Sequence, residues 1–121
     1  MEEGKKVFIF DDNKELLELC TILLEESGYK IKTSTTSNNI IQQVSAYQPD
    51  IIFMDNWLPD VSGIEATRQL KADEDLKDIP VVYFSANINV GALAKEAGAD
   101  DYLAKPFDIS SLEEIVRKHT Q

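Results

Sequence analysis

Two adjacent aspartates, Asp11 and Asp12, come directly after the apolar run at residues 7–10. A strand end that opens a helix is usually a phosphate site lined by glycine or serine, because backbone N–H groups and the helix dipole attract anions there. Paired carboxylates would repel each other and repel a phosphate. Phosphate chemistry at this position therefore requires a dication, and Mg²⁺ held by carboxylate oxygens and water is the ordinary candidate.

Polar side chains also follow three other apolar runs. They are Asp55 after residues 51–54, Ser85 after residues 81–84, and Lys105 after residues 102–104. If these runs are neighbouring strands, the polar groups meet at one edge of a sheet. Two carboxylates about 5 Å apart repel by roughly 3 kcal/mol at an effective dielectric of about 20. A lysine and a dication would offset that repulsion.

The apolar runs have the character of buried strands. Nearly continuous hydrophobicity over about four residues is typical of strands covered on both faces, as in a parallel sheet. Residues 30–33 differ, because lysine alternates there with isoleucine and threonine. Such a pattern is typical of an edge strand that avoids pairing with another chain.

Amphipathic patterns between and after these runs predict five helices. The expected inward residues are Leu16, Leu19, Cys20, Leu23 and Leu24 in the first, Ile40, Ile41 and Val44 in the second, Ile64, Ala66, Thr67 and Leu70 in the third, and Ile109, Leu112, Ile115 and Val116 in the fifth. The expected boundary signals are a cap at Asp12 or Asn13, a stop at Gly28, a capping box from Ser62 to Glu65, a stop at Gly98 and a cap at Asp108. This alternation predicts a doubly wound α/β domain, whose reactive crevice lies beyond the carboxyl ends of the strands.

Size and composition narrow the class of protein. A chain of 121 residues predicts a single domain, and its net charge of -10 argues against sequence-independent binding to nucleic acid or to an anionic membrane. Cys20 is the only cysteine, so an internal disulfide is excluded, and we expect its thiol in the core. We expect His119 to be solvated. No stretch approaches a membrane span in length, and we expect a soluble, cytoplasmic protein.

Four segments surround the polar groups: IFDD at residues 9–12, FMDNWLPDVSGIEA at 53–66, YFSA at 83–86 and GADDYLAKPF at 98–107. Together they resemble the receiver domain of two-component response regulators, and the similarity covers essentially the whole chain. Each segment alone is a weak signal, but all four in this order are highly specific. The resemblance implies a flavodoxin-like fold with a five-stranded parallel sheet in the order 2-1-3-4-5 and five helices, so residues 1–121 would form a single receiver domain.

The resemblance also implies roles at the acidic edge. Asp55 is the implied phosphoacceptor, a nucleophile that attacks phosphorus and becomes an aspartyl phosphate. The implied cofactor is Mg²⁺ or Mn²⁺. Asp12 would bind the ion directly and Asp11 largely through water, and the side chain of Asp55 and the backbone carbonyl of Trp57 would complete the protein ligands.

Lys105 and the hydroxyl of Ser85 are the implied partners of the phosphoryl oxygens, because phosphoryl transfer spreads charge over those oxygens. The peptide bond between Lys105 and Pro106 is expected to be cis, as in the family. Trp57 and Asn87 occupy two positions that commonly tune phosphate lifetime. We hypothesise that the bulk of Trp57 shields the phosphoryl group and lengthens its lifetime. The alternative is that Trp57 contributes only its carbonyl.

The implied switch and partners follow from the added charge. Phosphorylation would place about -1.5 to -2 charges beside the aspartates. In the family, the hydroxyl equivalent to Ser85 then moves toward the phosphoryl group, and the aromatic equivalent to Tyr102 turns inward. The surface formed by the fourth helix, the last strand and the fifth helix then changes the partners that it prefers to bind. A homodimer through that surface is one possible outcome. The implied donor is a histidine kinase or a histidine phosphotransfer domain at the first helix, and the implied receiver of the signal is a downstream protein target, with no direct binding of nucleic acid or membrane.

Three other functions are alternatives to a phosphorylatable signalling switch. A haloacid dehalogenase-type phosphohydrolase would have a nucleophilic aspartate at the end of its first strand and another aspartate two residues later. In this sequence the residue two places after Asp11 is Asn13. A flavodoxin-like cofactor binder would have small hydroxyl residues and glycine in the first loop. A degenerate receiver would have no chemical need for all five polar groups. We therefore expect a signalling phosphoacceptor rather than an enzyme, either as a stand-alone regulator or as a piece of a hybrid kinase or larger regulator.

Overall fold

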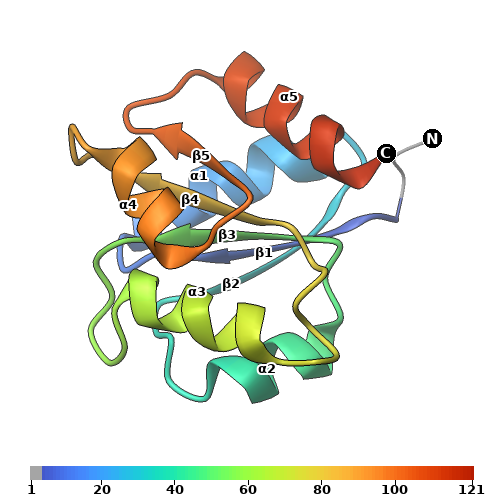
Figure 1. The fold of residues 1–121 in the computed structure, drawn as a ribbon. Helices are drawn as coiled ribbons and strands as arrows, with labels where there is room; N and C mark the ends of the chain where they lie inside the picture. Colours follow the sequence, from blue (N-terminus) through green and yellow to red (C-terminus); the bar gives the residue numbers. More distant parts are fainter. Residues whose placement is uncertain (1–3) are drawn as a thin grey trace.

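Strands and helices alternate five times in the computed structural model, which describes residues 4–121 (Figure 1). The elements are β1 (Lys6–Phe10), α1 (Lys14–Glu26), β2 (Lys30–Ser34), α2 (Ile40–Tyr47), β3 (Ile51–Asp55), α3 (Gly63–Ala72), β4 (Val81–Ser85), α4 (Val90–Ala97), β5 (Asp101–Ala104) and α5 (Ile109–Thr120). Each strand is one residue longer than its predicted run. The added residues are polar, and they still pair with a neighbouring strand.

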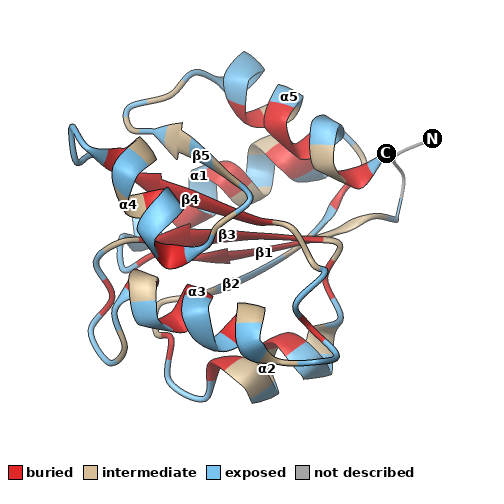
Figure 2. Ribbon diagram, in the orientation of Figure 1, coloured by how far each residue is buried: buried red, intermediate tan, exposed pale blue. Residues whose placement is uncertain are grey.

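The sheet is parallel throughout and has the order β2-β1-β3-β4-β5, as the resemblance implied. The apolar positions of the central strands β1, β3 and β4 are buried, whereas the edge strand β2 has exposed and half-buried residues (Figure 2). This contrast confirms the distinction drawn from sequence. All five strands deliver their carboxyl ends to the same edge of the sheet.

Two hydrophobic clusters lie on opposite faces of the sheet, because successive strand residues point to opposite sides. Helices α2, α3 and α4 cover one cluster, in which the rings of Phe8 and Phe10 stack with centroids 4.2 Å apart. Helices α1 and α5 cover the other, in which Phe53 and Phe84 meet edge to face at 5.7 Å. Within the described part of the chain, no helix has both the length and the apolar character needed to cross a membrane.

The buried face of α1 differs from the prediction. Leu17, Cys20 and Leu24 are its buried residues, while Leu19 is 52% exposed. Apolar side chains cover more than half of this helix, so periodicity alone left two adjacent faces possible, and contact with the sheet selected one. Ile109 was also predicted to face inward but is 37% exposed, because it lies in the first turn of α5 and the packed residues begin at Leu112.

Capping side chains fix where the helices begin. Asn13 rather than Asp12 caps α1, since its side chain accepts hydrogen bonds from the backbone N–H groups of Glu15 and Leu16. Ser62 and Asp108 cap α3 and α5 as predicted. Because Asn13 performs the capping, the carboxylate of Asp12 remains available at the edge of the sheet.

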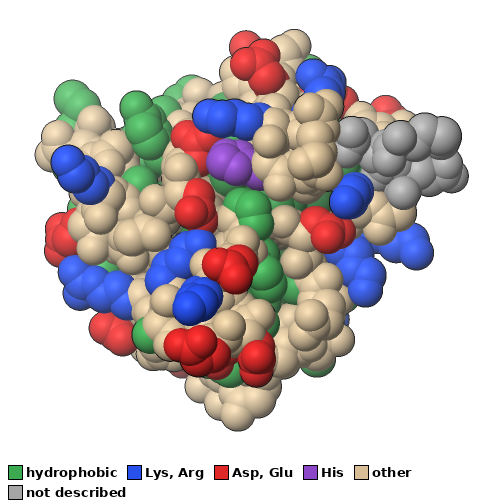
Figure 3. All heavy atoms as spheres, turned by 45° about the vertical axis from the view of Figure 1, so that its right-hand side comes forward, with side chains coloured by type: hydrophobic (Ala, Val, Ile, Leu, Met, Phe, Trp, Pro, Cys, Tyr) green, Lys and Arg blue, Asp and Glu red, His purple; other side chains and the backbone are tan. Residues whose placement is uncertain are grey.

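His119 is not solvated as predicted. Its side chain is only 16% exposed, and its Nε2 lies 2.9 Å from Oδ2 of Asp101 on β5. Figure 3 shows the ring of this only histidine at the surface among acidic and basic side chains. Burial acts to raise the pKa of Asp101, but hydrogen bonds from His119, Tyr102 N–H and Lys118 outweigh it and lower that pKa. These contacts tie the end of α5 to the start of β5.

Candidate functional site

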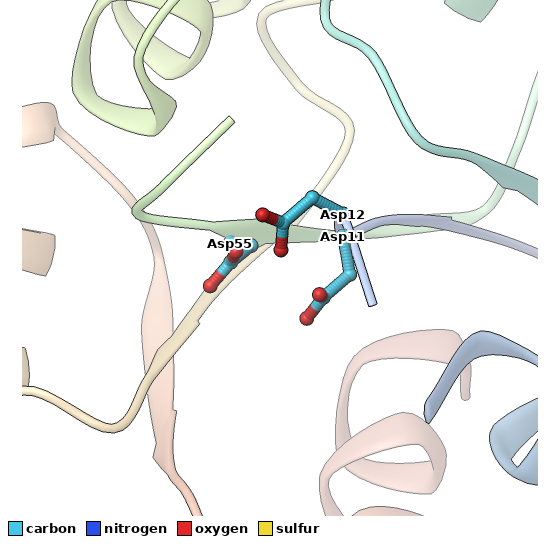
Figure 4. A group of neighbouring side chains, drawn as sticks. All are labelled: Asp11, Asp12 and Asp55. Carbon is cyan, nitrogen blue, oxygen red and sulfur yellow. The ribbon is translucent and has the colours of Figure 1, made fainter. Parts of the chain in front are cut away.

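Three carboxylates converge at the carboxyl edge of the sheet (Figure 4). Asp11 and Asp12 follow β1, and Asp55 is the last residue of the adjacent strand β3. One oxygen from each carboxylate can be chosen so that all three lie within 4.8 Å of one another. Asp11 and Asp55 are buried and Asp12 is exposed, so the cluster opens to solvent on one side.

Lys105 completes this cluster from β5's end of the sheet. Its Nζ lies 2.5 Å from Oδ2 of Asp11 and 3.1 Å from Oδ1 of Asp55, and it sits 4.5 Å from the centre of the Phe84 ring. Its backbone N–H donates to the carbonyl of Ser85 over 2.9 Å, and the bond between Lys105 and Pro106 is cis, as expected. The lysine is thus held by its backbone as well as by its side chain.

The acidic groups exceed the cationic charge in this cluster. Burial and, after it, the charge of Asp11 raise the pKa of Asp55 to about 6, although Lys105 acts in the opposite direction. Burial also acts to lower the pKa of Lys105, but its bond to Asp11 and the charge of Asp55 outweigh burial and raise that pKa. Three carboxylates facing one ammonium leave net negative charge, which suits a hard divalent cation with oxygen ligands.

The loop after β3 is held tightly beside Asp55. Gly63 N–H donates to the carbonyl of Asn56 over 3.1 Å. A Cβ atom at Gly63 would lie only 2.1 Å from the carbonyl oxygen of Asp55, so this close approach requires glycine. The hydroxyl of Tyr83 on β4 donates a hydrogen bond to Oδ1 of Asn56. Neither role could be predicted from sequence, because a glycine or a tyrosine has no local pattern that points to its contact with Asn56.

The remaining predicted residues differ in burial and in their contacts. Ser85 is buried at the end of β4, and its Oγ accepts a hydrogen bond from Asn87 N–H over 3.0 Å. Trp57 is 76% exposed, so its ring is not part of the core. Tyr102 is 51% exposed, and a Cβ at Gly91 of α4 would be 3.4 Å from its ring. The structure thus brings Asp11, Asp12, Asp55 and Lys105 together as the centre of the site.

In doubly wound sheets ligands bind beyond the carboxyl ends of the strands, and the three carboxylates and the lysine gathered there form a site that could hold a divalent cation. Among proteins with such a fold and site, the family is clear: the response regulator receiver domain model matches residues 7–117. The chain belongs to this family and acts as a phosphoacceptor in two-component signalling. This membership sets aside the phosphohydrolase and cofactor-binding alternatives.

Individual relatives agree with this assignment. The chain is 32% identical to the polar-differentiation response regulator DivK of Brucella ovis, over 95% of each chain. It is 33% identical to the phosphate regulon transcriptional regulatory protein PhoB of Pseudomonas aeruginosa, covering 95% of this chain and 53% of PhoB.

Among solved structures, the chain resembles the receiver domain of a Pseudomonas aeruginosa sensor histidine kinase, which has a magnesium ion coordinated in its active site cleft. The TM-score is 0.88 at 27% identity, with 97% of this chain and 98% of the other covered. The receiver domain of a signal transduction histidine kinase from Syntrophus aciditrophicus gives the same TM-score and identity, with 97% and 90% covered.

Proposed function

We propose that Asp55 is the residue that accepts the phosphoryl group, from a histidine kinase or a histidine phosphotransfer domain. Its Oδ atom would form the new bond to phosphorus while the bond from phosphorus to the donor's imidazole nitrogen breaks. The observation that carries this proposal is the position of Asp55, which is buried, bonded to Lys105 and gathered with Asp11 and Asp12.

The donor set fits a magnesium or manganese ion. Three carboxylates can each offer an oxygen within a small region, and hard divalent cations prefer such ligands. We assign the side chains of Asp11, Asp12 and Asp55 and the backbone carbonyl of Trp57 as the residues that would hold it. When bound, the ion would neutralise negative charge on the phosphoryl oxygens.

Lys105 and Ser85 supply the chain's own contacts to the phosphoryl group in this proposal. Lys105 already points its ammonium between Asp11 and Asp55, so it can pair with a phosphoryl oxygen attached to Asp55. The hydroxyl of Ser85 accepts from Asn87 N–H through a lone pair. Its proton therefore stays available to donate to a second phosphoryl oxygen.

The same proposal extends to the switch. Tyr102 lies half-exposed against α4, and we assign this outward position to the unphosphorylated state. Movement of Ser85 toward the phosphoryl group and of Tyr102 inward would alter the surface of α4, β5 and α5. That surface would bind a downstream protein target or a second copy of the chain, and α1 would bind the phosphodonor.

We also propose that residues 1–121 act as one receiver domain in the cytoplasm, and that the chain is not an enzyme in the ordinary sense. It would catalyse only the gain and loss of its own phosphoryl group. Trp57 and Asn87, which flank the site, would set how long that group persists. For Trp57 the shielding hypothesis predicts faster dephosphorylation in Trp57→Ala, measured as loss of phosphorylated protein over time.

The direct test is incubation with acetyl phosphate and Mg²⁺, followed by intact mass measurement. The parent protein should gain the mass of one phosphoryl group, and Asp55→Asn should gain none. Asp60→Asn is the matched control, because Asp60 is an exposed aspartate shortly after Asp55 and should not be needed. A chelator should abolish the gain in the parent. Modification that persists in Asp55→Asn would refute the assignment.

A further inference from the structure

The contact between Tyr83 and Asn56 joins two neighbouring strands directly beside the site. Tyr83 is fully buried on β4, with its ring in the cluster under α2, α3 and α4. Its hydroxyl reaches the side chain of Asn56, the first residue after β3. A tyrosine is costly to bury unless its hydroxyl finds a partner, so this bond satisfies the ring's polar end.

Asn56 lies between the two groups that the proposed metal site requires from this loop. Asp55 precedes it and offers a carboxylate, and Trp57 follows it and offers the backbone carbonyl. Asn56 itself is held at two points, because its carbonyl accepts from Gly63 N–H and its Oδ1 accepts from Tyr83. Two anchors on Asn56 limit rotation of the peptide unit that joins Asn56 to Trp57, which directly precedes the peptide unit that carries the Trp57 carbonyl.

The tyrosine is suited to act as a permanent donor. Burial raises the pKa of its phenol, and the charge of Asp55 raises it further, so the hydroxyl keeps its proton at neutral pH. The phenol therefore donates to Asn56 whatever the ionisation of the nearby carboxylates.

We propose that Tyr83 is a positioning residue, which acts through Asn56 to hold the loop after β3 in the arrangement that binds the divalent cation. This inference rests on the proposed function of Asp55 and its metal ligands. It adds Tyr83, whose ring is buried under α2, α3 and α4, to the residues that determine metal affinity. The hydroxyl of Tyr83 contacts Asn56 rather than a carboxylate of the site, so its effect would be on affinity for the ion rather than on phosphoryl transfer.

The test is calorimetric titration of Mg²⁺ into the parent, Tyr83→Phe, Asn56→Ala and the double variant. One hydrogen bond contributes about 0.5–1.5 kcal/mol, so Tyr83→Phe should weaken Mg²⁺ binding by about two- to tenfold. The double variant should bind no more weakly than the weaker single variant, since both changes remove the same contact. Tyr47→Phe is the matched control, because Tyr47 lies at the other end of the sheet beside Lys6, and it should bind like the parent.

A second measurement separates positioning from a general loss of structure. At saturating Mg²⁺, Tyr83→Phe should gain phosphate from acetyl phosphate at nearly the rate of the parent, whereas at low Mg²⁺ it should be slower. A rate that stays low at saturating Mg²⁺ would overturn the inference, as would Mg²⁺ affinity equal to that of the parent. A parent that itself neither binds Mg²⁺ nor gains phosphate would instead overturn the proposed function, and this inference with it.

Discussion

Ionised Asp55 destabilises the metal-free fold, because its pKa is raised by burial and by the neighbouring Asp11. A carboxyl group with a higher pKa in the folded state than in the unfolded state binds protons more tightly when folded. Stability therefore falls as the pH rises from the unfolded value of about 4 through the folded value of about 6. Above that window the penalty is constant, and below it the penalty is absent.

This sign gives a stability prediction for Asp55→Asn, which removes the ionisable group and keeps a similar shape. In chelator at pH 8, the variant should be more stable than the parent by about 3 kcal/mol, and at pH 4 the difference should shrink towards zero. Denaturant unfolding at both pH values checks this. An equal gain at both pH values would contradict the electrostatic origin.

Thr67 on α3 offers a second prediction at the level of one atom. Its Oγ1 is buried and has no hydrogen-bond partner among the described residues. A buried polar atom without a partner keeps its desolvation cost, and an apolar group of the same shape does not. We expect Thr67→Val to raise the free energy of unfolding by about 1 kcal/mol, measured by urea denaturation. Thr67→Ser, which keeps the hydroxyl and loses a methyl, is the control and should be destabilising.

The packing of the start of α3 against the end of β3 depends on Gly63. An added Cβ would collide with backbone atoms of Asp55 and Asn56, which cannot move without displacing the strand end. We expect Gly63→Ala to lower the free energy of unfolding by about 3 kcal/mol and to weaken Mg²⁺ binding.

The matched glycine is Gly91 in α4, where a Cβ would make ordinary contact with the ring of Tyr102. Gly91→Ala should instead stabilise the protein by about 0.5–1 kcal/mol, because alanine loses less conformational freedom in a helix. Thermal unfolding of the two variants should shift in opposite directions. A shift of the same sign in both would show that steric contact is not the deciding factor.

Much of the element order could be predicted from sequence, since continuous apolar runs and helical periodicity report burial locally. The face of α1 could not be fixed, because Leu17 and Leu19 are both apolar and only the sheet distinguishes them. The contact of His119 with Asp101 was missed for a related reason: the partners lie on different elements, and neither has a local pattern that points to the other. Asp11, Asp55 and Lys105 were found because chemistry constrained their residue types.

At the scale of the whole molecule, the two ends of the sheet have different roles. The carboxyl end carries the acidic cluster, while at the amino end Lys71 joins three segments. Its Nζ donates to the carbonyls of Lys77 and Ile79 over 3.1 and 3.0 Å, and it pairs with Asp100 at 2.5 Å. Asp100 also accepts from Val81 N–H at the start of β4. Lys71 therefore connects α3 with the entrances to β4 and β5.

We expect Lys71→Met to lower the free energy of unfolding by about 1–2 kcal/mol, since it leaves two carbonyls and a carboxylate without this donor. It should leave Mg²⁺ affinity and phosphate gain unchanged, because the contacts lie at the far end of the sheet from Asp55. Chemical denaturation and the phosphorylation assay check the two parts. A loss of phosphate gain in folded Lys71→Met would show that the two ends are coupled.

The order of the strands also has a consequence for how the chain is made. Strand β1 is the first of the five strands to be synthesised, but its two partners in the sheet are β2 and β3, which follow later in the chain. One side of β1 therefore has no partner strand on the nascent polypeptide until β3 has been translated. During that interval α1 is the nearest element that can pack against the apolar residues of β1. We therefore expect cotranslational folding to begin with a partly buried β1–α1 unit and the cooperative formation of the sheet to follow only after β3 has been translated.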